Sequence, residues 1–218
     1  MSKLFFDWVE KQLGESVAMT KEPHGDQSDV YRLATPKGNY FLKIASGLAR
    51  ERERLEWLDG KLPVPKVIGF TSSEGKDALI VSAIKGIDLA KLSKEWPAEK
   101  VVERIAGALR QFHSINIGDC PFGITGANKV LVHGDACLPN FIFQGEAFSG
   151  YVDLGDMRID LPELDFSAAI WSLQHNLGRG HGLKFLKEYG VKDATQELAE
   201  KLRLHYEDIQ KEWGLASE

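Results

Sequence analysis

The stretch from residue 131 to residue 155, LVHGDACLPNFIFQGEAFSGYVDLG, constrains this chain more than any other part of its sequence. It holds three acceptor side chains, Asp135, Asn140 and Asp153, within a short span. Short apolar runs typical of strands flank them at residues 130–132, 141–143 and 151–152. The pattern predicts three polar groups that neighbouring strands bring close together.

The spacing of these groups follows the phosphoryl-transfer motif of kinases. A His-x-Asp ends at Asp135, Asn140 comes five residues later, and an Asp-x-Gly begins at Asp153 after a short hairpin. In this chemistry one carboxylate takes the proton of the acceptor hydroxyl. An amide oxygen and a second carboxylate hold Mg²⁺ against the ATP phosphates. The motif therefore predicts a base and two magnesium ligands.

Length and charge set further limits. The chain has 218 residues, 43% of them hydrophobic, which suits one or two compact lobes with a real core. Residues 144–218 carry 8 Lys and Arg against 14 Asp and Glu. An acidic C-terminal part disfavours nucleic acid and favours a small cationic partner, although a solvated acidic helix face has the same composition.

Cysteine usage and the N-terminus favour a cytoplasmic protein. Two cysteines, Cys120 and Cys137, cannot form a disulfide framework in a chain of this length. The first fourteen residues, MSKLFFDWVEKQLG, lack the apolar core of a signal peptide, and the sequence has no apolar run long enough for a membrane span. We expect no membrane partner, and a monomer or weak dimer.

Hydrophobic periodicity predicts an α+β fold in two lobes. A helix at residues 3–13 precedes five antiparallel strands joined by tight turns, and a loop at 156–162 separates the motif from later helices. The strands are expected at 16–21, 29–34, 39–45, 66–71 and 77–83, and the later helices at 97–113, 163–176, 182–188 and 195–213. The expected small lobe is 1–83, the hinge 84–86 and the mainly helical lobe 87–218.

Lys43, inside the third expected strand, and Glu51, in the helix after it, form a candidate ion pair. Glu51 shares the apolar stripe of its helix with three leucines. A carboxylate on a buried face requires a cation partner, and Lys43 lies just upstream. Kinases present a lysine to the ATP phosphates in this way. A solvent-facing Lys43 is the alternative interpretation, and Glu53 is a weaker partner.

These residues together resemble the aminoglycoside 3′-phosphotransferases, a family of antibiotic-resistance enzymes with a protein-kinase-like fold. The similarity is strongest in HGDACLPN at 133–140 and GYVDLG at 150–155. It extends to VYRL at 30–33, WLDGKLPVPKV at 57–67 and QFHSINIGDCP at 111–121. Several separated motifs in the same order make the resemblance specific, and it runs from about residue 1 to about residue 190.

The resemblance implies roles for matching positions. Asp135 would be the catalytic base, Asn140 and Asp153 would hold Mg²⁺, and His133 and Asp165 would support the catalytic loop. ATP would be the co-substrate. Lys43 would contact the ATP phosphates and Glu51 would orient it, while Phe41 would stack on adenine. Ser82 to Ile84 would form the hinge, and Asp26 to Ser28 would form the loop over the phosphates.

The sequence departs from the family where the acceptor binds. Only nineteen residues, 114–132, stand where the family usually has a helical insertion that forms part of the antibiotic site. Asp156 stands where the family usually has an arginine. Near the C-terminus, the candidates for contacts to the acceptor are Glu207, Asp208 and Glu212. Asp156, beside the expected metal site, is a further candidate. Fold and reaction class are therefore better defined by the sequence than the acceptor.

The leading hypothesis is an ATP-dependent O-phosphotransferase acting as an aminoglycoside 3′-kinase. A related small-molecule kinase with another amino-sugar, an amino-alcohol or a macrolide acceptor is the first alternative, favoured by the short central interval. A catalytically silent nucleotide-binding remnant is the second. Four intact residues argue against silence, because each serves the chemistry: Lys43, Asp135, Asn140 and Asp153.

Overall fold

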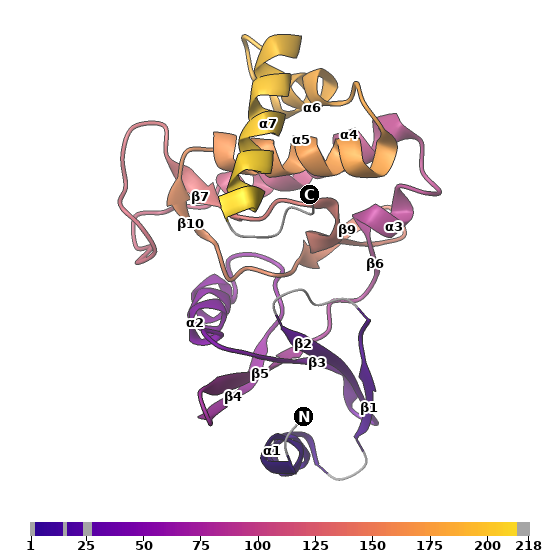
Figure 1. Cartoon of the computed structure of the whole chain (residues 1–218), viewed down its shortest axis with the longest axis vertical. Helices are drawn as coiled ribbons and strands as arrows, with labels where there is room; N and C mark the ends of the chain where they lie inside the picture. The colour runs from indigo at the N-terminus through magenta and orange to yellow at the C-terminus, as the bar shows by residue number, and fades with distance from the viewer. Residues whose placement is uncertain (1–2, 15–16, 24–27, 213–218) are drawn as a thin grey trace. The chain divides into compact units, whose positions relative to one another are not determined.

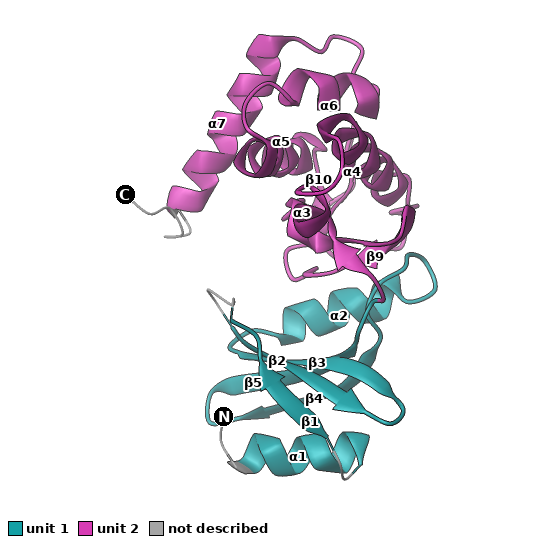
Figure 2. Ribbon diagram, turned by 90° about the vertical axis from the view of Figure 1, so that its right-hand side faces the viewer, with its two compact units in different colours: residues 1–84 teal, residues 85–218 magenta. Residues whose placement is uncertain are grey.

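The computed structural model describes residues 3–14, 17–23 and 28–212. The chain divides into two compact units, residues 1–84 and 85–218 (Figure 2). Among the described residues, no helix combines the length and the apolar character that crossing a membrane requires.

The first unit is a five-stranded antiparallel sheet with two helices (Figure 1). The strand order is β1-β2-β3-β5-β4. Strands that follow each other in the chain are paired, except that β3 pairs with β5 and not with β4. The elements are α1 (Lys3–Leu13), β1 (Ala18–Lys21), β2 (Asp29–Thr35), β3 (Gly38–Ala45), α2 (Ala49–Leu58), β4 (Val67–Ser73) and β5 (Lys76–Ser82).

Strand alternation separates a core face from a polar face in β3. Leu42 and Ile44 are buried in a cluster with Phe5 and Val9 of α1. Because successive side chains of a strand point to opposite faces, Lys43 points away from α1. Figure 2 shows α1 and α2 on opposite sides of the sheet, so Lys43 points to the side on which α2 lies.

The second unit contains four longer helices and two small sheets. One sheet pairs β7 with β10 and the other has the order β6-β8-β9. The elements are β6 (Ile87–Asp88), α3 (Leu89–Leu92), α4 (Ala98–His113), β7 (Val130–Val132), the 3₁₀ turn η1 (Leu138–Asn140), β8 (Phe141–Gln144), β9 (Ala147–Tyr151), β10 (Arg158–Asp160), α5 (Glu163–Leu177), α6 (Gly182–Tyr189) and α7 (Gln196–Glu212).

An aromatic cluster joins α4 to the hairpin of the second unit. Phe112 lies edge-on to Tyr151, with ring centroids 4.9 Å apart, and Phe141 lies 5.9 Å from the same tyrosine. All three side chains are fully buried. Such edge-to-face pairs add to the gain from burial, so they hold β8 and β9, the two strands before Asp153, against α4.

The expected α+β fold, with a five-stranded antiparallel sheet and a mainly helical second part, is confirmed. The expected loop at 156–162 is wrong in its centre, because residues 158–160 form β10 against β7. The sequence also missed β6 and α3. β6 has only two residues, so its pairing with β8 rather than a local pattern creates it. α3 has four residues and is capped by Asp88, whose side chain accepts from the Lys91 N–H. Residues 114–129 contain no helix or strand beyond one bridge from Gly123 to Ile159.

Phe5→Ala should lower the free energy of unfolding by about 3–5 kcal/mol, because it removes a ring from the core beneath the sheet. Phe5 is only 4% exposed, whereas its neighbour Phe6 is 39% exposed. Phe6→Ala is therefore the matched control and should cost about 1 kcal/mol or less. Urea denaturation of both variants measures the difference, and equal losses would contradict the packing of α1 on the sheet.

Candidate active site

The candidate catalytic loop, residues 133–140, requires a glycine at position 134. Gly134 has φ +88°, a left-handed conformation that costs other residues free energy. A Cβ at this position would also lie 2.4 Å from the main-chain oxygen of Asp156, closer than real atoms approach. The glycine in the His-Gly-Asp motif is therefore required for the loop to pass close to the segment that follows Asp153.

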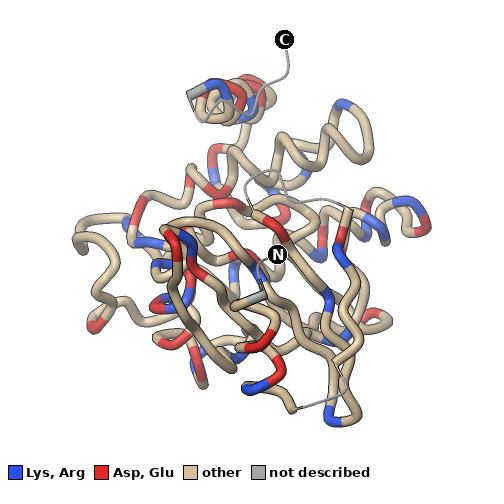
Figure 3. The backbone as a smooth tube through the Cα atoms, turned by 60° about the horizontal axis from the view of Figure 1, so that its bottom comes forward, with Lys and Arg blue, Asp and Glu red and all other residues tan. Residues whose placement is uncertain are grey.

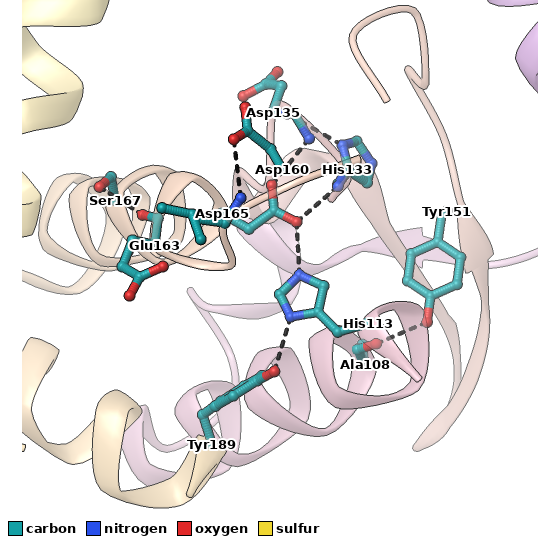
Figure 4. A network of polar contacts seen from close by, with 12 residues as sticks. Ala108, His113, His133, Asp135, Tyr151, Asp160, Glu163, Asp165, Ser167 and Tyr189 are labelled. Atoms are coloured by element: carbon teal, nitrogen blue, oxygen red, sulfur yellow. Dashed lines mark hydrogen bonds and ion pairs between the residues drawn. The ribbon is translucent and has the colours of Figure 1, made fainter. Parts of the chain in front are cut away.

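Asp165 holds this loop from α5 (Figure 4). Its fully buried carboxylate accepts the main-chain N–H of His133 at 2.7 Å on Oδ2 and that of Gly134 at 2.9 Å on Oδ1. Oδ2 also accepts from His113 Nε2 at 2.9 Å. Three donors on one carboxylate fix the loop immediately before Asp135.

The ring of His113 extends the network to α6. Because the Asp165 carboxylate only accepts, His113 Nε2 carries the proton and donates. His113 Nδ1 then accepts from the hydroxyl of Tyr189 at 2.8 Å. Burial raises the pKa of Tyr189, so its hydroxyl stays protonated and able to donate. Residues of α4, α5 and α6 thus support one loop.

Asp135 and Asn140 are in direct contact. Asn140 Nδ2 donates to Asp135 Oδ2 and to the Asp135 main-chain oxygen, each at 2.9 Å. Since the amide nitrogen is used in this way, the amide oxygen of Asn140 is left to act as an acceptor or a metal ligand. The half-buried carboxylate of Asp135 and the buried amide of Asn140 therefore form one hydrogen-bonded pair. The carboxylate can accept a proton, and the amide oxygen can bind a metal ion.

The second oxygen of Asp135 accepts a hydrogen bond that the sequence did not reveal. The hydroxyl of Tyr206, on α7, donates to Asp135 Oδ1 at 2.8 Å. Tyr206 continues the apolar stripe of Ala199 and Leu202 along α7, so its position in the sequence resembles that of an ordinary core residue. The sequence analysis selected the acids next to it, Glu207 and Asp208, and missed Tyr206.

Asp153 occupies a strained backbone position two residues after the end of β9. Its φ is +61°, which is uncommon for a residue other than glycine and costs about 1–3 kcal/mol. The residue before it is clamped on both sides: the Val152 N–H donates to Asn140 O at 3.0 Å, and the Val152 oxygen accepts from His133 Nε2 at 3.1 Å. These bonds tie the exposed Asp153 to both ends of the catalytic loop.

Asn140 and Asp153 carry side-chain oxygens of the type that Mg²⁺ prefers as ligands. Within residues 3–14, 17–23 and 28–212, no group of three or more His, Cys, Asp or Glu side chains forms a metal cluster. This arrangement fits Mg²⁺ bound with a nucleotide, because that ion takes one or two protein ligands and completes its shell with phosphate and water.

Lys43 and Glu51 form the ion pair of the first unit. Lys43 Nζ lies 2.6 Å from Glu51 Oε1, and the glutamate is 5% exposed. The alternative partner, Glu53, is exposed and lies beside Arg52 at 3.6 Å. The pair forms because strand alternation directs Lys43 to the face on which α2 lies, and the helical period directs Glu51 to the core side of α2.

The remaining nucleotide candidates lie on β3, β5 and the segments next to them. Phe41 is half-buried on the same face as Lys43, and the guanidinium of Arg32 lies 5.5 Å from its ring. The Ser82 N–H donates to Lys66 O at 2.9 Å, so this main-chain donor is already used. Ile84 follows the end of β5, and Ser28 directly precedes β2. Asp26 lies outside the described residues.

Two of the candidate acceptor-binding acids, Glu207 and Asp208, have cation partners. Glu207 pairs with the buried Arg203, and Asp208 Oδ1 lies 3.0 Å from Lys211 Nζ. The Asp156 main-chain oxygen accepts from Arg158 Nη1 at 3.2 Å. The side chain of Glu212 lies outside the described residues.

An open cavity of about 810 Å³ lies along α7, next to the end of α5 and the segment 179–182. Asp208 lines it, but so do Arg179 and Arg203, and its charges of opposite sign are balanced in number. Figure 3 shows the same mixing of Lys and Arg with Asp and Glu along the described chain. The cavity alone does not indicate the charge of a ligand.

Comparison with known proteins gives consistent results. The model of a family described as "Phosphotransferase enzyme family" matches residues 20–129 and 125–200. An aminoglycoside 3′-phosphotransferase from Niallia circulans is 31% identical over 212 residues, which covers 74% of this chain and 81% of the relative.

Solved structures show the same fold. A crystal structure of an aminoglycoside-3′-phosphotransferase of type VIII superposes with a TM-score of 0.75 at 22% identity, covering 94% of this chain and 99% of that chain. The aminoglycoside phosphotransferase APH(3″)-Id from Streptomyces rimosus, in complex with ADP and streptomycin, has a TM-score of 0.73 at 20% identity, covering 95% and 98%. Similarity at this identity establishes the fold.

Asp165→Ala should lower the free energy of unfolding by about 3–5 kcal/mol, because it leaves two main-chain N–H groups and His113 without their buried acceptor. Asp160→Ala is the control. Its side chain is 37% exposed and pairs with Arg158 at 3.0 Å, so its loss should cost about 1 kcal/mol or less. Urea denaturation compares the two. Similar small losses in both variants would show that Asp165 does not hold the loop.

Proposed function

This chain belongs to the phosphotransferase enzyme family, and we propose that it is an ATP-dependent O-phosphotransferase whose acceptor is an aminoglycoside. The observation that carries the proposal is the contact of Asp135 with Asn140, with Asp153 tied to the same loop through Val152. This arrangement has one carboxylate suited to a hydroxyl proton and separate oxygens suited to a metal ion. The relative from Niallia circulans, an aminoglycoside 3′-phosphotransferase by name, supports the acceptor class.

Asp135 acts as the base in this proposal. As the acceptor oxygen bonds to the γ-phosphorus, the bond from that phosphorus to the bridging oxygen breaks and ADP leaves. The acceptor proton passes to the Asp135 carboxylate. Each carboxylate oxygen has two acceptor positions, so Oδ2 can receive this proton while Asn140 Nδ2 still contacts it. General-base positioning of this kind typically contributes about 10²–10⁴-fold.

Asn140 and Asp153 hold Mg²⁺ in the proposal. The bound ion would neutralise charge on the ATP phosphates. The contribution of the chain is orientation: the Asn140 amide nitrogen is held by Asp135, and the bonds of Val152 limit the movement of Asp153. Both ligands are therefore positioned before the nucleotide binds, which lowers the cost of ordering them.

The first unit contributes the remaining nucleotide contacts. Lys43, oriented by Glu51, binds ATP phosphates, and Ser28 belongs to the loop that covers them. Phe41 stacks on adenine. Because the Ser82 N–H is bonded to Lys66, the main chain at Ile84, in the proposed hinge 84–86, carries the adenine contact. The proposal includes a cytoplasmic location and a monomer or weak dimer.

A related kinase with a different acceptor is the second candidate function. Two observations favour it: residues 114–129 form no helix, and Glu207 and Asp208 are paired with Arg203 and Lys211. A large polycation needs several available carboxylates, so these pairs would have to open to bind an aminoglycoside. Another amino sugar, an amino alcohol or a macrolide makes smaller demands on acidic contacts.

Asp135→Asn should reduce turnover by about 10²-fold or more and leave nucleotide affinity nearly unchanged, because the amide cannot take the acceptor proton. The assay is magnesium- and ATP-dependent release of ADP with kanamycin as acceptor. Asp193→Asn is the matched control, since Asp193 is exposed in the turn before α7 and should keep full turnover.

The outcomes separate the candidate functions. Wild-type turnover in Asp135→Asn would remove Asp135 from the base role. ADP release that requires an amino sugar, amino alcohol or macrolide in place of kanamycin would favour the second candidate. Nucleotide binding without release across all these acceptors would favour a silent remnant.

Asp153→Ala should weaken the binding of magnesium–ATP by about 10-fold or more, because a metal ligand is lost. Asp153→Asn tests the same point while keeping a residue type that tolerates the left-handed backbone. Isothermal titration with ATP, with and without Mg²⁺, measures the effect. A loss of the same size in the absence of Mg²⁺ would contradict the metal role, and Asp193→Ala serves as the exposed control.

A further inference from the structure

We propose that Tyr206 is a positioning residue for the catalytic base: its hydroxyl holds Asp135 in the orientation that proton transfer needs. This inference rests on the proposed function, because it assigns Tyr206 a part in the role given to Asp135. The contact is direct, since the Tyr206 hydroxyl donates to Asp135 Oδ1 at 2.8 Å.

The carboxylate of Asp135 is held from two elements of the second unit. Asn140, at the end of η1, donates to Oδ2 at 2.9 Å, and Tyr206, from α7, donates to Oδ1. A carboxylate with one donor can rotate about its χ2 bond, whereas a donor on each oxygen fixes the carboxylate plane. Both oxygens keep a further acceptor position, so neither bond excludes the acceptor hydroxyl.

The phenol ring is itself held in place. Tyr206 is 3% exposed, and its ring lies 5.5 Å from that of Trp171 on α5. The sulfur of Cys137 lies 3.4 Å from the Tyr206 oxygen. The single hydroxyl proton of Tyr206 goes to Asp135, and the Cys137 thiol has an acceptor of its own in the main-chain oxygen of Ala168 at 3.9 Å. The tyrosine therefore has a defined ring position and a defined hydroxyl direction.

Protonation supports the same direction of donation. Burial is the main cause that raises the pKa of Tyr206 well above its usual value, so the phenol remains a donor at neutral pH. The pKa of the Cys137 thiol is also raised well above its usual value, first by desolvation and then by the charge of Asp135. The phenol is thus the donor, and the Asp135 carboxylate the acceptor, in their contact.

A purely structural role for the hydroxyl is the alternative, because a buried phenol needs some hydrogen-bond partner. Tyr151 provides the comparison within the same unit. It is fully buried, and its hydroxyl donates at 2.8 Å to the main-chain oxygen of Ala108, on α4. Tyr206→Phe and Tyr151→Phe each remove one buried hydroxyl bond, but only the first removes a bond to Asp135.

The experiment measures kcat, the KM for ATP and thermal unfolding for both variants in the ADP-release assay, using whichever acceptor supports turnover. Tyr206→Phe should lower kcat by about 10-fold and leave the KM for ATP within about 2-fold, because a bond to a charged group is lost at the base alone. Tyr151→Phe should lower stability by a similar amount and leave kcat unchanged. Tyr206→Met repeats the test with a flexible side chain if the phenylalanine variant folds poorly.

A second comparison places Tyr206→Phe in the Asp135→Asn background, where it should have almost no further effect on residual turnover. Unchanged kcat in Tyr206→Phe would overturn the inference, as would an equal loss in Tyr151→Phe or an undiminished loss in the Asp135→Asn background. Wild-type turnover in Asp135→Asn alone would instead overturn the proposed function, so the two failures are distinguishable.

Discussion

The organisation of the second unit depends on one buried carboxylate that touches no substrate in the proposal. Asp165 accepts two consecutive main-chain N–H groups and a histidine, and so replaces the hydrogen bonds that a tight turn between a strand and a loop cannot make for itself. The helix that carries it is packed among other helices. The packing of α5 against its neighbouring helices thereby fixes the position of the main chain just before Asp135.

The site proper is built from short segments whose contacts are mostly main chain. Val152 bonds to both His133 and Asn140, and Gly134 approaches Asp156 closely. None of these contacts needs a long side chain, so each has little conformational freedom to lose when it forms. This explains how the segments 133–140 and 152–157, which have no regular secondary structure beyond η1, can present polar groups in a defined arrangement.

Sequence alone could predict the parts of this arrangement that follow from residue type and period. The spacing of Asp135, Asn140 and Asp153 indicated the chemistry, and strand and helix periods led from Lys43 to Glu51, which the structure places 2.6 Å apart. Tyr206 could not be found in this way, because it lies 71 residues from Asp135 and occupies an apolar stripe. The short strand β10 was missed for the same reason, since its partner β7, not its own three residues, creates it.

At residue 153, thermodynamic stability and the proposed catalytic activity favour different residue types. A glycine there would relieve the strain of the left-handed backbone, and selection for thermal resistance alone would favour it. Such a change would remove the carboxylate that the proposed chemistry uses as a magnesium ligand. A search for hardier variants of this chain should therefore hold residue 153 constant and look for its gains elsewhere, for instance on the exposed surface of the helices.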